Sequence, residues 1–307
     1  MKKLLSKAAT ALCIAVFSFS AGADDSEQCM LSVDNMRDTY SKSSIEATVI
    51  LSEQYVTEPF SHVHYYNNGI PYSSWKTLNN EVEGYALRKG KGFDFNQNRG
   101  YLGPMVWHQS YIFDRIFSNT TTLNGYECSI VGRTRLAGRR VTVMQLSSLD
   151  VPRYNYIVSK DVDTNLPVEL AVMSPDKRVI TKMTVTALHS ASGQTVNFPD
   201  EAFDRIDSML KQSKQSDADN SMTPWSELKI PRYFSLVSSG IEAQEGADLP
   251  YQKYTDGLVD FKVYRNLKTS LNIVSVSNGT ITVVRKNGRD YELSFDYKGA
   301  EYRRLWQ

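Results

Sequence analysis

No charge of one sign dominates this chain of 307 residues: 35 Lys and Arg stand against 34 Asp and Glu, a net charge of +1. This balance excludes a strongly basic nucleic-acid-binding protein and an acidic disordered tail. Proline and glycine are also scarce, with ten and 17 residues, which excludes a low-complexity chain. Aromatic side chains are abundant, with 18 Tyr and 12 Phe, and they favour a strand-rich globular protein.

The motifs of common enzyme classes are missing as well. The sequence contains no G-x-S-x-G, no glycine-rich phosphate loop, no C-x-x-C and no H-E-x-x-H. Carboxylate pairs such as Glu81 and Glu83 occur, but any chain with 34 acidic residues contains them. We therefore assign no catalytic residue, no resident metal and no cofactor, and we expect a protein that is not an enzyme.

A hydrophobic run of note occurs only at the N-terminus. Three lysines precede the apolar run 8–19, and the small residues of 20–23 precede Asp24. This pattern is typical of a secretory signal peptide cleaved after Ala23. The run is too short to cross a bilayer, which needs about 20 apolar residues, and no later segment reaches that length. We expect an exported, soluble protein, and export excludes nucleic acid as a partner.

Two cysteines remain after cleavage, because Cys13 lies in the signal peptide. In an oxidising compartment Cys29 and Cys128 are candidates for a disulfide that closes most of the first part of the chain. The alternative is a pair of separate buried thiols.

Hydrophobic periodicity divides the mature chain into a long first part and a shorter second part. The first part begins with a helix over 26–41 and continues with strands near 44–51, 60–66, 74–78 and 84–89, a loop over 90–104 and a short helix over 107–117. Five further runs predict a β-meander: 128–134, 140–146, 154–160, 168–173 and 180–185. A short helix over 199–211 closes this part.

The polar segment that follows resembles a linker, and a second, mostly β unit comes after it. Its strands are expected at 260–264, 271–276, 280–285 and 291–297. We therefore divide the chain into a signal peptide (1–23), an N-terminal domain (24–211), a linker (212–221) and a C-terminal domain (222–307).

Several residues are candidates for binding. His62 and His64 form an H-x-H pair that is compatible with two metal ligands, or with solvent-facing residues on an edge strand. The turn over 161–167 begins like a calcium loop, but Leu166 and Val172 replace its glycine and glutamate, so we interpret it as a hairpin turn. Tyr154 shares a strand face with Tyr156, where the two either line an apolar cavity or pack the sheet.

Four arginines lie within eight residues, and they form either a solvated hairpin or a site for an anionic ligand or an acidic partner segment. Their planar guanidinium groups suit carboxylate or phosphate. The four are Arg133, Arg135, Arg139 and Arg140.

Six segments together resemble the RseB/MucB family of periplasmic regulators of the sigma-E envelope-stress response. In the first part these are 130–139, 153–158 and 163–168, and in the second part 222–225, 230–239 and 254–261. The chain departs from the family pattern at Tyr233, where a glycine is expected, and over 291–307, where a turn and a final helix are expected.

The resemblance implies an α+β, mostly β fold: a half-open antiparallel β-barrel of the LolA/LolB type with helices, joined to a smaller β-rich C-terminal domain. It also implies a periplasmic negative regulator that binds the periplasmic domain of a single-pass anti-sigma factor and shields it from site-1 proteolysis. Lipid, lipoprotein acyl chains or lipopolysaccharide would release it. The alternative is a lipid or lipoprotein carrier of the LolA type.

On this reading the arginines contact anionic groups, the two tyrosines face the cavity, and three aromatic residues hold the C-terminal domain together. These are Trp225, Phe234 and Phe261. The releasing ligand and the oligomeric state, homo-oligomer included, stay open.

Overall fold

The chain is described from a computed structural model. The structure describes residues 21–53, 56–79, 84–88, 91–94, 99–100, 111–149, 153–174, 177–191, 201, 203–204, 223–226, 230, 232–244, 247–258, 260–264, 273–274, 282–286 and 290–294. The expected signal peptide up to residue 20, the linker 212–221 and Met222 lie outside these ranges. None of the described helices is long and apolar enough to span a membrane.

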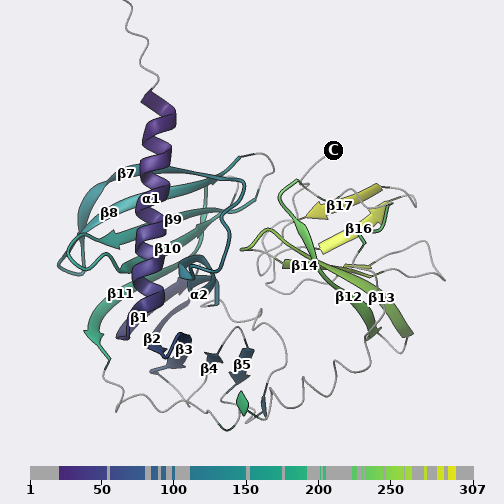
Figure 1. Cartoon of the computed structure of the whole chain (residues 1–307), viewed down its shortest axis with the longest axis horizontal. Helices are drawn as coiled ribbons and strands as arrows, with labels where there is room; N and C mark the ends of the chain where they lie inside the picture. The colour runs from purple at the N-terminus through teal and green to yellow at the C-terminus, as the bar shows by residue number, and fades with distance from the viewer. Residues whose placement is uncertain are drawn as a thin grey trace, which may run out of the picture.

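One antiparallel sheet of 11 strands forms the first part of the described chain (Figure 1). Its strands follow the order β6-β5-β4-β3-β2-β1-β11-β10-β9-β8-β7, so β6 and β7 are its two edges and the sheet is not closed. The strands are β1 (Ile45–Glu53), β2 (Val56–Asn67), β3 (Ile70–Thr77), β4 (Gly84–Arg88), β5 (Lys91–Asp94), β6 (Arg99–Gly100), β7 (Tyr126–Leu136), β8 (Arg139–Ser148), β9 (Asn155–Asp161), β10 (Pro167–Met173) and β11 (Val179–Ser190). The mostly β, half-open fold expected from the sequence is confirmed.

Turn residues fix the hairpins of this sheet. Between β2 and β3, Asn68 and Gly69 have φ of 48° and 80°, the left-handed pair that a two-residue hairpin requires. Ala137 and Gly138 do the same between β7 and β8, with φ of 46° and 81°. After β9 the Asp161 carboxylate accepts two backbone N–H groups of its own turn, which is a hairpin turn as predicted.

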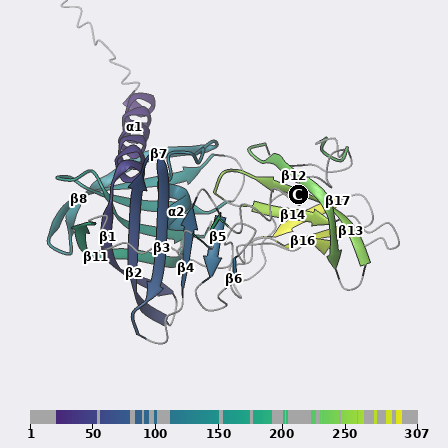
Figure 2. The ribbon, with the colours of Figure 1, turned by 60° about the horizontal axis from the view of Figure 1, so that its bottom comes forward.

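Two helices lie against the sheet. Helix α1 (Ala21–Lys42) packs on β7 and β10, begins five residues earlier than expected, and is joined to β7 by a disulfide between Cys29 and Cys128. Helix α2 (Tyr111–Phe117) is the described part of the expected helix 107–117. Seen from another side, β1–β6 follow one another across the front of the sheet (Figure 2).

The second part of the chain forms two smaller antiparallel sheets. One has the order β12-β13-β14 and the other β15-β16-β17. Their strands are β12 (Ser235–Gln244), β13 (Ala247–Thr255), β14 (Asp260–Tyr264), β15 (Ile273–Val274), β16 (Thr282–Lys286) and β17 (Asp290–Ser294).

The sequence interpretation was wrong in one segment and incomplete in another. The loop expected over 90–104 contains the short strands β5 and β6, because Lys91–Asp94 pairs with β4 and extends the sheet. Strands β12 and β13 were not predicted. Of the expected helix 199–211, the described residues 201 and 203–204 are helical, and Phe203 is fully buried.

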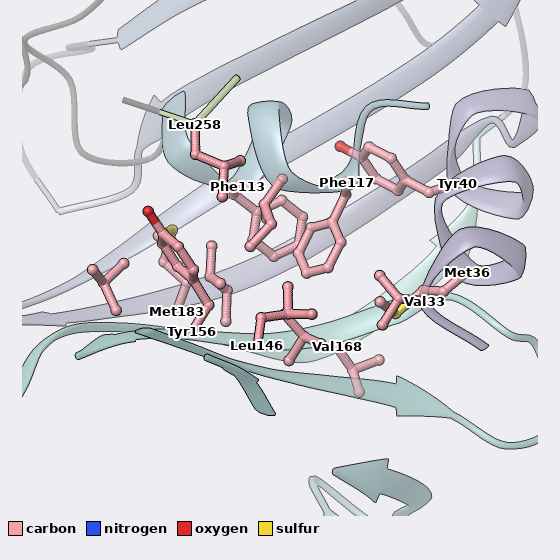
Figure 3. Packing of buried hydrophobic residues seen from close by; sticks show 14 of the residues in the cluster. Val33, Met36, Tyr40, Phe113, Phe117, Leu146, Tyr156, Val168, Met183 and Leu258 are labelled. Carbon is pink, nitrogen blue, oxygen red and sulfur yellow. The ribbon is translucent and has the colours of Figure 1, made fainter. Parts of the chain in front are cut away.

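The hydrophobic core lies between the 11-stranded sheet and the two helices (Figure 3). Met36 of α1, Phe113 of α2 and Leu146 of β8 pack within it. Leu258, from the turn between β13 and β14, is fully buried in the same cluster. The two parts of the chain therefore share apolar packing.

Candidate functional site

A cavity of about 660 Å³ lies where the turn after β13 meets the 11-stranded sheet. Its wall is formed by the end of α1, strand β3, α2 with the loop that follows it, and Thr255 and Gly257 of the second part. Arg37 of α1 donates hydrogen bonds to the Ser118 and Thr121 carbonyls, and these bonds hold that loop against the helix. Seven serine and threonine residues line the cavity, and Tyr72, Pro71 and Leu87 add apolar surface.

The carboxylate of Asp114, on α2, forms part of this wall and accepts four side-chain hydrogen bonds. Its Oδ1 accepts from the hydroxyls of Ser73 at 2.7 Å and Tyr40 at 3.2 Å. Its Oδ2 accepts from the indole of Trp75 at 2.8 Å and the hydroxyl of Tyr85 at 3.4 Å. Burial raises the pKa of Asp114 to about 6, although the four donors act in the opposite direction. The network therefore fixes α2 on strands β3 and β4 through one buried acid.

His62 joins this network through Tyr40, and the His64 ring lies 4.2 Å from the Tyr40 ring, so the alternative of an exposed edge strand was wrong. Strand β2 lies between β1 and β3, and both rings are buried. His62 Nε2 is 2.8 Å from the Tyr40 hydroxyl, and His64 Nδ1 is 2.8 Å from the Ser43 carbonyl oxygen. Burial lowers the pKa of His62 to about 3, helped by the nearby His64, and lowers that of His64 to about 4. Both rings are therefore neutral at pH 7. Among the described residues no cluster of three or more His, Cys, Asp or Glu side chains could hold a metal ion.

A buried ion pair attaches the second part of the chain beside this cavity. Arg153 Nη1 lies 2.6 Å from Asp256 Oδ2, and the two side chains are 1% and 0% exposed. The Arg153 guanidinium also donates to the Gly125 carbonyl at 2.7 Å and lies over the rings of Tyr126 and Tyr233. Asp256 Oδ1 accepts the backbone N–H of Leu258, so the same carboxylate shapes the turn that enters the core.

Next to this ion pair, the backbone of Gly257 lies very close to the loop that follows α2. Gly257 has φ of +99°, and a Cβ added there would lie 2.4 Å from the Thr122 carbonyl oxygen. Only glycine therefore lets the turn approach the loop after α2 this closely. Sequence reasoning found neither Asp114 nor the Arg153–Asp256 pair as site residues, although 254–261 carried part of the family resemblance.

The tyrosines proposed as cavity residues lie in the core. Tyr154 and Tyr156 are both buried, and neither lines the 660 Å³ cavity. Tyr156 packs against Tyr126 with ring centroids 5.7 Å apart, and Figure 3 shows its ring among the core side chains. Their contact with a ligand stays a prediction.

The arginine cluster is divided between two environments. Arg139 pairs with the buried Asp161 at 2.9 Å, and Arg140 pairs with the exposed Asp163 at 2.5 Å. Arg133 and Arg135 are exposed on β7. Together with Arg140 they border a separate groove of about 450 Å³.

The aromatic residues proposed for the C-terminal domain are only partly described. Phe234 is buried in the shared core, and Trp225 packs against that core. Phe261 lies on β14 opposite Tyr254 in the strand register, and its side chain is outside the described atoms. Trp225 also donates its backbone N–H to Gln252 at 3.1 Å.

The sequence is similar to curated sigma-E factor regulatory proteins. The sigma-E factor regulatory protein RseB of Escherichia coli K12 is 28% identical over 205 residues, covering 60% of this chain and 63% of that protein. RseB of Salmonella typhimurium is 28% identical over 176 residues, covering 55% of this chain and 54% of that protein. The chain thus spans 54–63% of the length of these curated relatives.

The fold agrees with a solved complex. MucB in the Pseudomonas aeruginosa MucA/MucB complex matches with a TM-score of 0.54 and 15% identity, over 88% of this chain and 91% of that one. The MucB/RseB N-terminal domain family matches residues 31–209, which is more than half of the sequence. On that match, this chain belongs to the MucB/RseB family.

Proposed function

We propose that this protein is a periplasmic, non-enzymatic regulator of sigma-E signalling. It binds the periplasmic domain of a single-pass membrane anti-sigma factor and shields that domain from site-1 proteolysis. The family match over 31–209 carries the proposal, and the agreement in fold with MucB extends through both parts of the chain. The solved relative is a MucA/MucB complex, and the curated relatives are sigma-E factor regulatory proteins.

Release of the anti-sigma factor by a lipid or a lipopolysaccharide-like molecule forms the second half of the proposal. The 660 Å³ cavity supports it, because Thr255 and Gly257 of the second part line that cavity beside β3 and α2 of the first. A ligand can shift a binding equilibrium only by its difference in affinity for the two states. A molecule that fills this cavity contacts both parts of the chain at once. Its affinity can therefore differ between the free protein and the protein bound to the anti-sigma factor.

The same cavity supports one competing function, that of a lipid or lipoprotein carrier. A carrier needs a cavity but has no need of a second part attached through a buried ion pair. The second part therefore favours the regulator.

A capture experiment tests the proposal. Purified protein comprising residues 24–307 is immobilised and exposed to a detergent-solubilised envelope fraction, and retained proteins are identified by mass spectrometry. Retention of a single-pass anti-sigma factor supports the regulator, and its loss on adding lipopolysaccharide supports the release step. Retention of lipoproteins or lipids without an anti-sigma factor would replace the regulator by the carrier.

A further inference from the structure

The hairpin of β7 and β8 carries a row of cations at its tip. Arg133 lies opposite Thr142 in the strand register, and Arg135 lies opposite Arg140. On the next strand, Lys160 lies opposite Thr142. Cross-strand partners share one face of a sheet, so these cations lie on one face, and Arg133, Arg135 and Arg140 line the 450 Å³ groove there.

The cations of this tip outnumber its acids. Arg140 is paired with Asp163, but their side chains are 60% and 62% exposed, so the pair contributes little stability. Neither Arg133 nor Arg135 has a carboxylate partner among the residues that the structure describes; Arg135 donates to the Gly138 carbonyl at 3.1 Å. Like charges directly opposite one another destabilise a strand pair, and a bound carboxylate between Arg135 and Arg140 would remove that cost.

The same segment is the edge of the 11-stranded sheet. Strand β7 pairs only with β8 among the described strands. At its start the Cys128 N–H donates to the Ser26 hydroxyl of α1, which protects that end of the edge. Beyond it, Ile130 and Val131 are 52% and 57% exposed, next to the arginines. An edge strand offers backbone N–H and C=O groups to an added strand.

We propose that the β7 edge from Gly132 to Leu136, which follows the register shift between Ile130 and Gly132, binds an extended, acidic segment of a partner protein as an added strand. Backbone pairing gives affinity, Ile130 and Val131 take apolar side chains, and Arg133, Arg135 and Arg140 take carboxylates. A second copy of this chain is the wrong occupant, because it would place its own arginines against these. The exposed apolar pair and the free strand edge favour a peptide over a phosphate headgroup. This proposal rests on the proposed function, since the partner it describes is the anti-sigma factor.

Model peptides test the surface directly. Fluorescein-labelled heptapeptides of alternating Glu and Val, alternating Gln and Val, and alternating Lys and Val are titrated with the mature protein, and binding is followed by anisotropy. The Glu/Val peptide should bind best, and its affinity should fall with added salt because exposed charges are screened within about 8 Å at physiological ionic strength. A Glu/Val peptide with N-methyl groups on alternate residues should lose binding, because it cannot pair with the edge.

Variants of the protein locate the site. Arg133→Ala/Arg135→Ala should weaken the Glu/Val peptide about 10-fold, which corresponds to about 1.4 kcal/mol, and Arg133→Glu/Arg135→Glu should weaken it further. Lys42→Ala/Lys177→Asn is the matched control, because it also removes two exposed positive charges, and Asn tolerates the φ of 66° at Lys177. Equal binding by the arginine and control variants, or full binding of the N-methylated peptide, would overturn the proposal. Phosphatidylglycerol vesicles that bind through the same arginines while the Glu/Val peptide does not would overturn it as well.

The capture experiment then separates this proposal from the proposed function. If the anti-sigma factor is retained equally by wild type and by Arg133→Glu/Arg135→Glu, the surface assignment fails and the regulator stands. If the peptides bind as expected but no anti-sigma factor is retained, the proposed regulatory function is refuted. The proposal that the β7 edge binds an acidic strand is then still supported. The arginines are exposed, so the variants should unfold at the same denaturant concentration as wild type.

Discussion

Replacing Asp256 with Asn should destabilise the protein far more than the loss of an ordinary surface charge. The substitution keeps the shape of the side chain but removes the carboxylate charge that pairs with the Arg153 guanidinium, which is 1% exposed. Removing one partner of a buried ion pair costs about 3–5 kcal/mol, because the remaining charge stays buried and uncompensated. The Gly125 carbonyl and the two flanking rings solvate Arg153 in part, which places the expected loss at the lower end, about 3 kcal/mol.

The chain offers a matched control for this variant. Asp163→Asn removes the same carboxylate from an arginine pair in which both side chains are more than half exposed, and should cost about 0–1 kcal/mol. Free energies of unfolding are measured for wild type and both variants by urea titration at pH 7. A third variant, Arg153→Met/Asp256→Leu, should recover part of the loss, because no unpaired charge stays buried. If Asp256→Asn costs no more than Asp163→Asn, the reasoning about this junction is refuted.

Two further predictions concern the disulfide and the buried titratable network. Cys29→Ser/Cys128→Ser opens a loop with a sequence separation of 99 residues and should lower the free energy of unfolding by about 4 kcal/mol, measured under non-reducing conditions; wild type with reductant should behave like the variant. Between pH 6.5 and pH 4 the protein should lose about 3 kcal/mol, because the unfolded state takes up protons at His62 and His64 that the folded state refuses. The raised pKa of Asp114 acts with the opposite sign, because the folded state takes up a proton there before the unfolded state does. Over this range it offsets about 2 kcal/mol of a histidine contribution of about 5 kcal/mol, so the free energy of unfolding of Asp114→Asn should fall more steeply with acid. A free energy of unfolding that stays flat or rises over this range would contradict the assignment.

The sequence predicts local structure well here and spatial neighbours poorly. The meander β7–β11 was found because alternation and turn residues act over a few positions, as at Gly138. The order of strands is not a local property, so the sequence leaves His62 and His64 as metal ligands or edge-strand residues, whereas β2 is flanked on both sides.

Long-range polar contacts were missed for the same reason. The Asp114 network joins a helix to Ser73 and Trp75, about 40 positions earlier. The Arg153–Asp256 pair joins residues 103 positions apart. No pattern in either neighbourhood marks these residues as partners. The family resemblance included 153–158 and 254–261 but not the contact between them.

The burial of Leu258 in the core of the first part has a consequence for folding. The matched family domain ends at residue 209, yet a chain cut there lacks the side chain that fills this place beside Phe113. The region of sequence similarity therefore ends at residue 209, but the unit that unfolds cooperatively does not end there. Both parts should therefore melt in one transition, because opening the core of the first part also exposes Leu258 of the second.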